Sequence, residues 1–206
     1  SMQRLAERHR VALRPHAKTH KSIEIARRQL AKGACGLTVA TVDEALVFLR
    51  SGIDALTISR PIASRPAYER LFADAATQGA DLSIVVDSEV GADLASESAA
   101  RAGRTLGAFV KIDVGLKRCG VDPSSAAPLE LARRVSQGPA LEFRGILSHA
   151  GQVYAANSKE EAAEIAAAER TTMIGVRDAL AAAGIPVPAV SVGATPTVLA
   201  ATDMEG

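Results

Sequence analysis

Four segments of the chain carry residue types that could do chemistry together. Lys18 follows the run VALRPHA, Arg118 lies within KIDVGLKRCGV, and His149 comes near the end of RGILSHA. The fourth segment, 193–195 (Gly-Ala-Thr), combines a glycine with a hydroxyl side chain. An unprotonated lysine amine attacks carbonyl carbons, and a glycine turn before a helix offers free N–H groups to a phosphate. Together these segments suggest a site for a phosphorylated aldehyde, provided that the fold brings them to one place.

Each of these residues also has a structural explanation that needs no ligand. A lysine at a strand end is commonly a solvated surface group, and Arg118 could pair with Asp113. A single histidine such as His149 is commonly a hydrogen-bonded core residue. His16 and His20 are four residues apart, a spacing that brings two metal ligands together on a helix but not at a strand end, so we predict no metal site there.

Short β-branched runs alternate with longer helical patterns along the chain. Several runs are continuously apolar, as expected for parallel strands covered on both faces. Helix starts are marked by Ser22, by Thr41 with Glu44 and by Ser158 with Glu161. The predicted strands are 11–18, 36–41, 55–59, 82–87, 107–113, 144–150 and 189–194, and the predicted helices are 22–33, 41–52, 66–79, 88–103, 128–138 and 158–184.

This alternation, without hairpin signals, predicts a parallel α/β fold. The turn after the first predicted strand, HAKTHKS, lacks the glycine-rich signature of a nucleotide-binding open sheet. We therefore predict a (β/α)8 TIM-type barrel, truncated before its eighth strand because the chain supplies seven strand candidates. The carboxyl ends of barrel strands form one mouth. We expect Lys18 to point into this mouth, where burial and neighbouring cations would lower its pKa.

Composition argues against several classes of partner. The chain has 206 residues, of which 48% are hydrophobic, with 24 Lys and Arg against 23 Asp and Glu. Balanced charge, and only two Tyr and four Phe without Trp, argue against nucleic-acid binding. No run reaches the roughly 20 apolar residues of a membrane span, and the N-terminal residues lack the apolar segment of a signal peptide. Two cysteines are too few for a disulfide framework. We expect a cytoplasmic protein that binds neither nucleic acid nor membranes.

At these motifs the sequence resembles the fold-type III pyridoxal-phosphate (PLP) enzymes with an alanine racemase-like barrel, and within them the D-threonine aldolase and D-serine dehydratase branch. The most specific string is RPHAKTHK, and GLTVAT, KIDVGLKRCGV, GILSHAGQVY and VSVGATPT match in the family's order. The resemblance implies that residues 1–206 form an incomplete PLP-binding barrel domain, and that the family's C-terminal β-domain is absent from this chain.

Carried over residue by residue, the resemblance gives each motif a role. Lys18 matches the catalytic lysine that forms a Schiff base with PLP. Arg118 matches the arginine that hydrogen-bonds the phenolate oxygen of PLP, and His149 matches the histidine that stacks on its ring. The remaining matches are a tyrosine near the cofactor and the phosphate-binding turn, namely Tyr154, Gly193, Ala194 and Thr195.

The resemblance implies a PLP-dependent lyase that cleaves or dehydrates a β-hydroxy-D-amino acid. Members of this branch use a divalent metal whose ligands belong to the β-domain, so we expect no metal ligands within this chain. Family members are dimers that share groups at the active site. We therefore expect the full-length protein to be a homodimer, and the truncated chain to lack groups needed for turnover.

Three alternatives remain open from the sequence. Single-domain homologues bind PLP without catalysis, which suits the length of the chain but not the RPHAKTHK string. An amino-acid racemase of the same fold also fits the motifs. A barrel without any cofactor would make the cluster of strand-end residues a coincidence.

Overall fold

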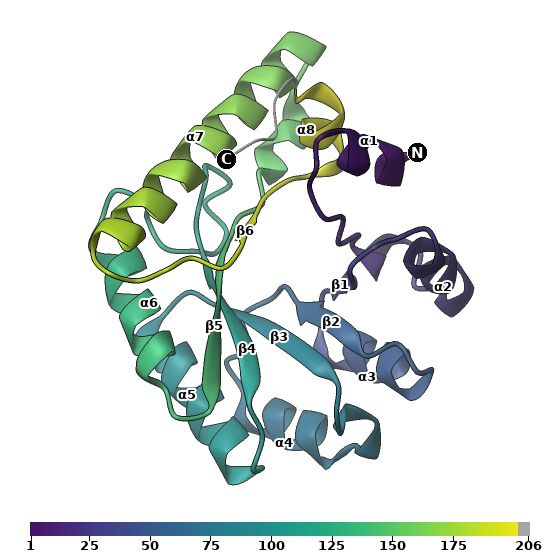
Figure 1. Cartoon of the computed structure of the whole chain (residues 1–206), viewed down its shortest axis with the longest axis vertical. Helices are drawn as coiled ribbons and strands as arrows, with labels where there is room; N and C mark the ends of the chain where they lie inside the picture. Colours follow the sequence, from purple (N-terminus) through teal and green to yellow (C-terminus); the bar gives the residue numbers. More distant parts are fainter. Residues whose placement is uncertain (202–206) are drawn as a thin grey trace.

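A computed structural model of the chain describes residues 1–201. Six parallel strands form one sheet in the order β1-β2-β3-β4-β5-β6. Strand order equals chain order, so every crossover steps one place along the sheet, as in a barrel and unlike a doubly wound sheet. Figure 1 shows the sheet curled into a half-barrel with helices on its outer side. The strands are β1 (Leu37–Val39), β2 (Ala55–Ile58), β3 (Asp81–Val86), β4 (Leu106–Lys111), β5 (Leu141–Leu147) and β6 (Val190–Ser191).

The helices alternate with these strands, and most follow the predicted ranges. The predicted caps form, since the side-chain oxygens of Ser22, Thr41 and Ser158 each accept a backbone N–H of the first helical turn. The helix predicted over 66–79 instead ends at Ala73 and is followed by a 3-10 turn. Among residues 1–201, no helix combines the length and apolarity needed to cross a membrane. The helices are α1 (Met2–Arg8), α2 (Ile23–Ala31), α3 (Val42–Arg50), α4 (Arg65–Ala73), α5 (Glu89–Arg101), α6 (Ala127–Gln137), α7 (Lys159–Ala182) and α8 (Thr195–Ala200), with 3-10 turns η1 (Ala17–Thr19), η2 (Ala75–Thr77) and η3 (Gly151–Ala155).

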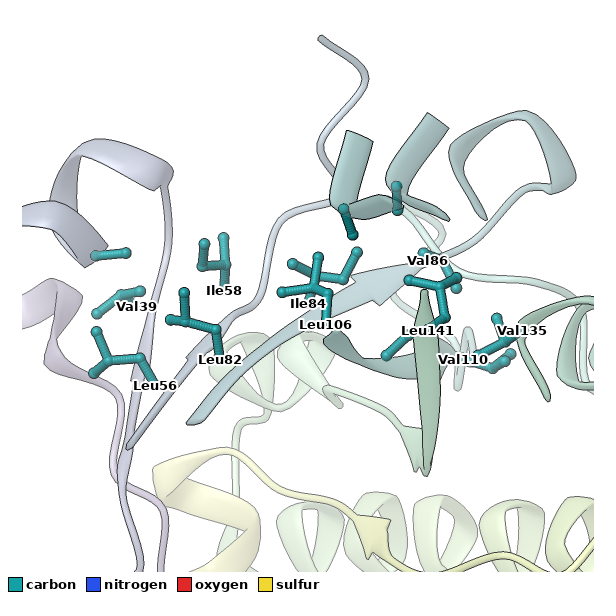
Figure 2. Close-up of a cluster of buried hydrophobic side chains, with 14 of the residues drawn as sticks. Val39, Leu56, Ile58, Leu82, Ile84, Val86, Leu106, Val110, Val135 and Leu141 are labelled. Atoms are coloured by element: carbon teal, nitrogen blue, oxygen red, sulfur yellow. The ribbon is translucent and has the colours of Figure 1, made fainter. Parts of the chain in front are cut away.

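Side chains alternate between two faces of the curled sheet. Those on the outer face pack against the helices and form the main core, with Leu56, Ile58 and Ile84 fully buried within it (Figure 2). Side chains on the inner face include a separate small cluster of Val85, Phe109 and Leu147 together with buried Thr57 and Ser83. The outer layer therefore supplies most of the hydrophobic stabilisation, and the inner face has room for polar groups.

The prediction of a strand over 11–18 is wrong. These residues form one parallel bridge, between His16 and Thr38, and then enter η1. The N–H of Thr38 donates to the carbonyl of Pro15, but Pro15 has no N–H with which to extend the ladder. Lys18 therefore lies in a 3-10 turn and not on a strand.

β5 carries a bulge that requires a glycine. Phe143 and Gly145 pair with consecutive residues of β4, so Arg144 is the extra residue. Gly145 has a φ of +119°, and a Cβ there would lie 1.9 Å from the carbonyl oxygen of Ala189. The same oxygen accepts the N–H of Ile146. The bulge thus sets how closely the segment that leads into β6 approaches β5.

We expect Gly145→Ala to lower the free energy of unfolding by about 3 kcal/mol or more, because the methyl group would collide with backbone and the left-handed φ would be strained. Gly175→Ala is the matched control, since its Cβ would meet no atom within 4 Å in α7; it should add about 0.5–1 kcal/mol. Urea unfolding measures both. A Gly145→Ala protein as stable as the wild type would show that the bulge is not constrained in this way.

Candidate functional site

The candidate site lies where the carboxyl ends of the strands come together. β4 ends at Lys111, His149 follows β5, and η1 places Lys18 beyond the bridge that joins His16 to β1. The charges of Lys18, Lys111 and Arg118 all act on the imidazole of His149. The structure therefore brings three of the predicted residues to one place, and adds a lysine that was not predicted.

His149 is held by the turn that follows β6. Its Nδ1 lies 3.3 Å from the carbonyl oxygen of Gly193, and because that oxygen can only accept, Nδ1 carries the proton. Burial lowers the pKa of His149, and the nearby cations lower it further against the opposing effect of this hydrogen bond. The imidazole is therefore neutral near pH 7. A Cβ at Gly151 would lie 3.1 Å from Nε2, so glycine there leaves room for the ring.

Tyr154 lies beside His149. The two ring centroids are 6.5 Å apart with an interplanar angle of 51°. The tyrosine belongs to η3, and 66% of its surface is exposed. It can therefore reach a ligand that contacts His149 without first leaving a packed position.

The turn 193–195 presents fewer free donors than its sequence suggests. The N–H of Gly193 donates to Oε1 of Glu169 over 3.3 Å, and the N–H of Ala194 donates to Oγ1 of Thr197 over 2.8 Å. Thr195 is exposed at the first position of α8. Its N–H and hydroxyl are the groups of the turn that remain available for an anion, whereas Gly193 and Ala194 contribute backbone shape.

His16 fixes the backbone of Lys18. Its Nδ1 accepts the N–H of Lys18 over 3.2 Å, and its Nε2–H donates to Oγ of Ser59 over 3.1 Å. The Ser59 hydroxyl in turn donates to the carbonyl of Val39 over 3.0 Å. Burial lowers the pKa of His16 to about 4, and the charge of Lys18 contributes. A neutral His16 therefore ties η1 to the ends of β1 and β2.

The buried amine of the site is Lys111 and not Lys18. Lys18 is exposed, contrary to the expectation of a buried lysine, whereas Lys111 is only 4% exposed. Burial lowers the pKa of Lys111 to about 8; the charge of Arg118 adds to this effect, and Cys119, Glu169 and Asp87 oppose it. Sequence reasoning overlooked Lys111, although a lysine that ends the buried run GAFVK was a usable signal.

A second buried group that sequence reasoning missed is Glu169 on α7, which is 3% exposed. Burial raises the pKa of its carboxyl group, while hydrogen bonds from Ser148, Gly193 and Ala150 oppose the rise. Its sequence context, AAAER within an alanine-rich helix with several other glutamates, gives no sign of burial.

Within residues 1–201, the cations of the site make no ion pair, although the charges of Glu169 and Asp87 act on Lys111. Arg118 is exposed and does not pair with Asp113, whose Oδ1 instead accepts two backbone N–H groups of the following loop. Neither Lys18 nor Lys111 makes an ion pair with any described residue. The described part of the chain also holds no group of three or more His, Cys, Asp or Glu residues that could bind a metal ion. The site is suited to an anionic ligand.

Comparison with known proteins places the chain in a family. The family model for the alanine racemase N-terminal domain matches residues 1–205. The D-threo-3-hydroxyaspartate dehydratase of Delftia sp. (strain HT23) is 34% identical over 205 residues, which cover 100% of this chain and 53% of that protein. The D-threonine aldolase of Arthrobacter sp is 40% identical over 165 residues, which cover 80% of this chain and 43% of the relative.

Solved structures agree with this placement. The Delftia dehydratase superposes with a TM-score of 0.90 at 33% identity, over 100% of this chain and 54% of the other. The D-threonine aldolase from Filomicrobium marinum gives a TM-score of 0.90 at 31% identity, over 97% of this chain and 54% of the other. The chain thus spans about half the length of the relatives that it matches. The predicted truncated barrel is confirmed as the fold.

The pH dependence of stability tests the neutral state of His16. Its pKa is about 4 in the folded protein against 6.5 ordinarily, so between these values the unfolded chain binds more protons. The contribution of neutral His16 to the free energy of unfolding is therefore complete above pH 6.5 and is lost as the pH falls toward 4. His16→Asn keeps a capping side chain and removes the titration, so its free energy of unfolding should change less with pH across this window. Equal slopes in urea unfolding of both proteins would contradict the assignment.

Proposed function

Because the chain belongs to the alanine racemase N-terminal domain family, we propose that it is the PLP-binding part of a lyase that cleaves or dehydrates β-hydroxy-D-amino acids. The observation that carries the proposal is a group of three cations, Lys18, Lys111 and Arg118, whose charges all act on the neutral imidazole of His149 and which make no ion pair among the described residues. Relatives described as D-threonine aldolase and D-threo-3-hydroxyaspartate dehydratase support the substrate class.

The residues of the site fit PLP in their chemistry. Lys18 supplies the amine, and its exposure leaves it accessible to an aldehyde. Arg118, which stays charged at all ordinary pH values, and the buried amine of Lys111 supply positive charge for a phenolate oxygen. The N–H and hydroxyl of Thr195 supply donors for a phosphate, and the neutral ring of His149 supplies a flat surface for an aromatic ring. When bound, PLP supplies an electron sink for negative charge that develops at the substrate Cα.

Lys18 has two tasks in this proposal. Its Nζ would hold the aldehyde carbon of PLP covalently, with loss of one water molecule. Displaced by the amino group of a substrate, Nζ would be a free amine that can take up or return a proton as a base. The hydrogen bond from the Lys18 backbone N–H to His16 fixes the backbone from which this amine extends.

Two outcomes follow from proton removal at the substrate. Loss of the β-hydroxyl proton with cleavage of the Cα–Cβ bond of a β-hydroxy-D-amino acid, followed by return of a proton to Cα, would give glycine and an aldehyde. Loss of the Cα proton followed by hydroxide gives, after hydrolysis, a keto acid and ammonia. Both reactions need the same groups at Cα, so the pocket around the β-substituent decides between them.

For the whole protein, the family resemblance supports a homodimer that uses a divalent cation at the β-hydroxyl through ligands outside residues 1–201. It works on a small amino acid and not on nucleic acid or at a membrane. Cys35 and Cys119 are free thiols, which suits a reducing compartment such as the cytoplasm.

We expect PLP to give the purified protein a visible absorption band that borohydride bleaches, and Lys18→Ala to abolish this band. Lys21→Ala is the matched control, because Lys21 is three residues away and pairs with Glu44 on the surface; it should keep the band. Absorption spectra of the three proteins decide the matter. A band of wild-type intensity in Lys18→Ala would refute the assignment of the amine.

Arg118→Ala should weaken PLP retention about tenfold, as expected for the loss of a charged hydrogen bond, without lowering the Tm of the PLP-free protein. The side chain is exposed and unpaired among the described residues, so the fold does not depend on it. Arg133→Ala, at another exposed arginine, should change neither property. Equilibrium dialysis and thermal unfolding measure both, and a fall in Tm that matches the loss of retention would indicate a structural role for Arg118.

A further inference from the structure

We propose that Glu169 is a positioning residue that fixes the ends of β5 and β6 relative to each other, and with them His149 and the 193–195 turn. This inference rests on the proposed function, because it concerns how the protein keeps its PLP-binding groups in place. Nothing in the sequence or in the comparisons assigns a role to this residue.

Three donors from two separate segments converge on one oxygen of Glu169. The hydroxyl of Ser148 donates to Oε1 over 2.6 Å, and the N–H of Ala150 donates to it over 3.2 Å. These two residues flank His149 in the chain. The third donor is the N–H of Gly193, at 3.3 Å. The carboxylate therefore links both sides of the histidine to the turn after β6.

The sheet itself does little to hold these two segments together. β6 has two residues, and only Val190 and Ser191 pair with β5. The last backbone hydrogen bond between the segments runs from the N–H of Ser148 to the carbonyl of Ser191 over 2.9 Å. Beyond that point the hydrogen bonds between the segments run through Glu169 and from His149 to Gly193, while Val153 and Ala194 pack in a small apolar cluster with Ala162. The carboxylate thus connects the two segments by hydrogen bonds beyond the last backbone hydrogen bond between them.

The hydrogen bonds close a ring around the histidine. Glu169 accepts the N–H of Gly193, the carbonyl of Gly193 accepts Nδ1–H of His149, and the neighbours of His149 bind Glu169 again. Removal of the carboxylate leaves Gly193 without a partner for its N–H. The carbonyl that orients the imidazole, and Thr195 two residues further on, then lose their fixed position.

Simple docking of α7 does not explain a glutamate at this place. The other buried residues of the helix are Ala162, Met173, Val176 and Leu180, and an apolar side chain would avoid the desolvation of a buried carboxylate. A buried acceptor is favoured only if its hydrogen bonds are needed. The charge of Lys111 acts on this carboxylate, and the hydrogen bonds of the carboxylate link the residues beside His149 to the turn.

The first experiment measures PLP affinity by absorbance titration of the intact protein. Glu169→Ala should bind PLP about tenfold more weakly, since it loses hydrogen bonds to a charged group. Glu169→Gln keeps an oxygen at the Oε1 position and should stay within about threefold of the wild type. Glu164→Ala, which removes an exposed glutamate from the same helix, should equal the wild type. Equal affinities of Glu169→Ala and Glu164→Ala would overturn the proposal.

The second experiment needs no cofactor. Backbone amides of 148–151 and 190–197 should exchange hydrogen faster in PLP-free Glu169→Ala than in Glu164→Ala, while amides of β3 and β4 should be unchanged. Exchange that rises uniformly over the chain, or not at all, would overturn the positioning role. If Glu169→Ala does not fold, Ser148→Ala takes its place, because it deletes the shortest of the three bonds: faster local exchange supports the proposal, and wild-type exchange overturns it.

The two proposals fail in distinguishable ways. If the wild-type protein gives no Lys18-dependent absorption band with PLP, the proposed function fails. If the wild type binds PLP normally and Glu169→Ala matches Glu164→Ala in affinity and in exchange, only the role of Glu169 fails.

Discussion

Burial of a lysine amine among other charged groups is the constraint on which the site depends. Burial lowers the pKa of Lys111 to about 8; the charge of Arg118 acts in the same direction, whereas Cys119, Glu169 and Asp87 oppose the fall. The charges of Lys111, Lys18 and Arg118 all act on the imidazole of His149, and these three cations make no ion pair among residues 1–201. A ligand that brings a phenolate and a phosphate would place negative charge beside them. Binding of such a ligand should therefore stabilise the fold as well as complete the site.

The half-barrel creates this cluster from segments that are far apart in the chain. Parallel strands in chain order deliver their carboxyl ends to the same side of the sheet. Short-range contacts then position each group. His16 holds the backbone of Lys18, Gly151 leaves room for the ring of His149, and Glu169 holds the turn after β6. Each contact acts on a different member of the cluster.

Much of this arrangement could be predicted from the sequence. Apolar runs and capping residues gave the order of strands and helices, and the family motifs gave Lys18, Arg118 and His149, which the structure brings together. The strand over 11–18 failed because Pro15 cannot donate to a ladder. Lys111 could have been found from the sequence, because it is a charged residue at the end of a buried apolar run. Glu169 could not, because it is one of several glutamates in an alanine-rich helix, and its burial depends on which face of that helix packs against the sheet. The packing of that face is visible only in the structure.

The most direct test is to locate the bond between PLP and the protein. Borohydride reduction in the presence of PLP, followed by peptide mapping with mass spectrometry, reports which lysine carries the pyridoxyl group. Lys111 competes chemically for the aldehyde, because burial lowers its pKa from the ordinary 10.5 to about 8. At neutral pH a larger fraction of its amine is therefore unprotonated than in an ordinary lysine. We predict the label on Lys18. A label on Lys111, or an unlabelled protein, would contradict it.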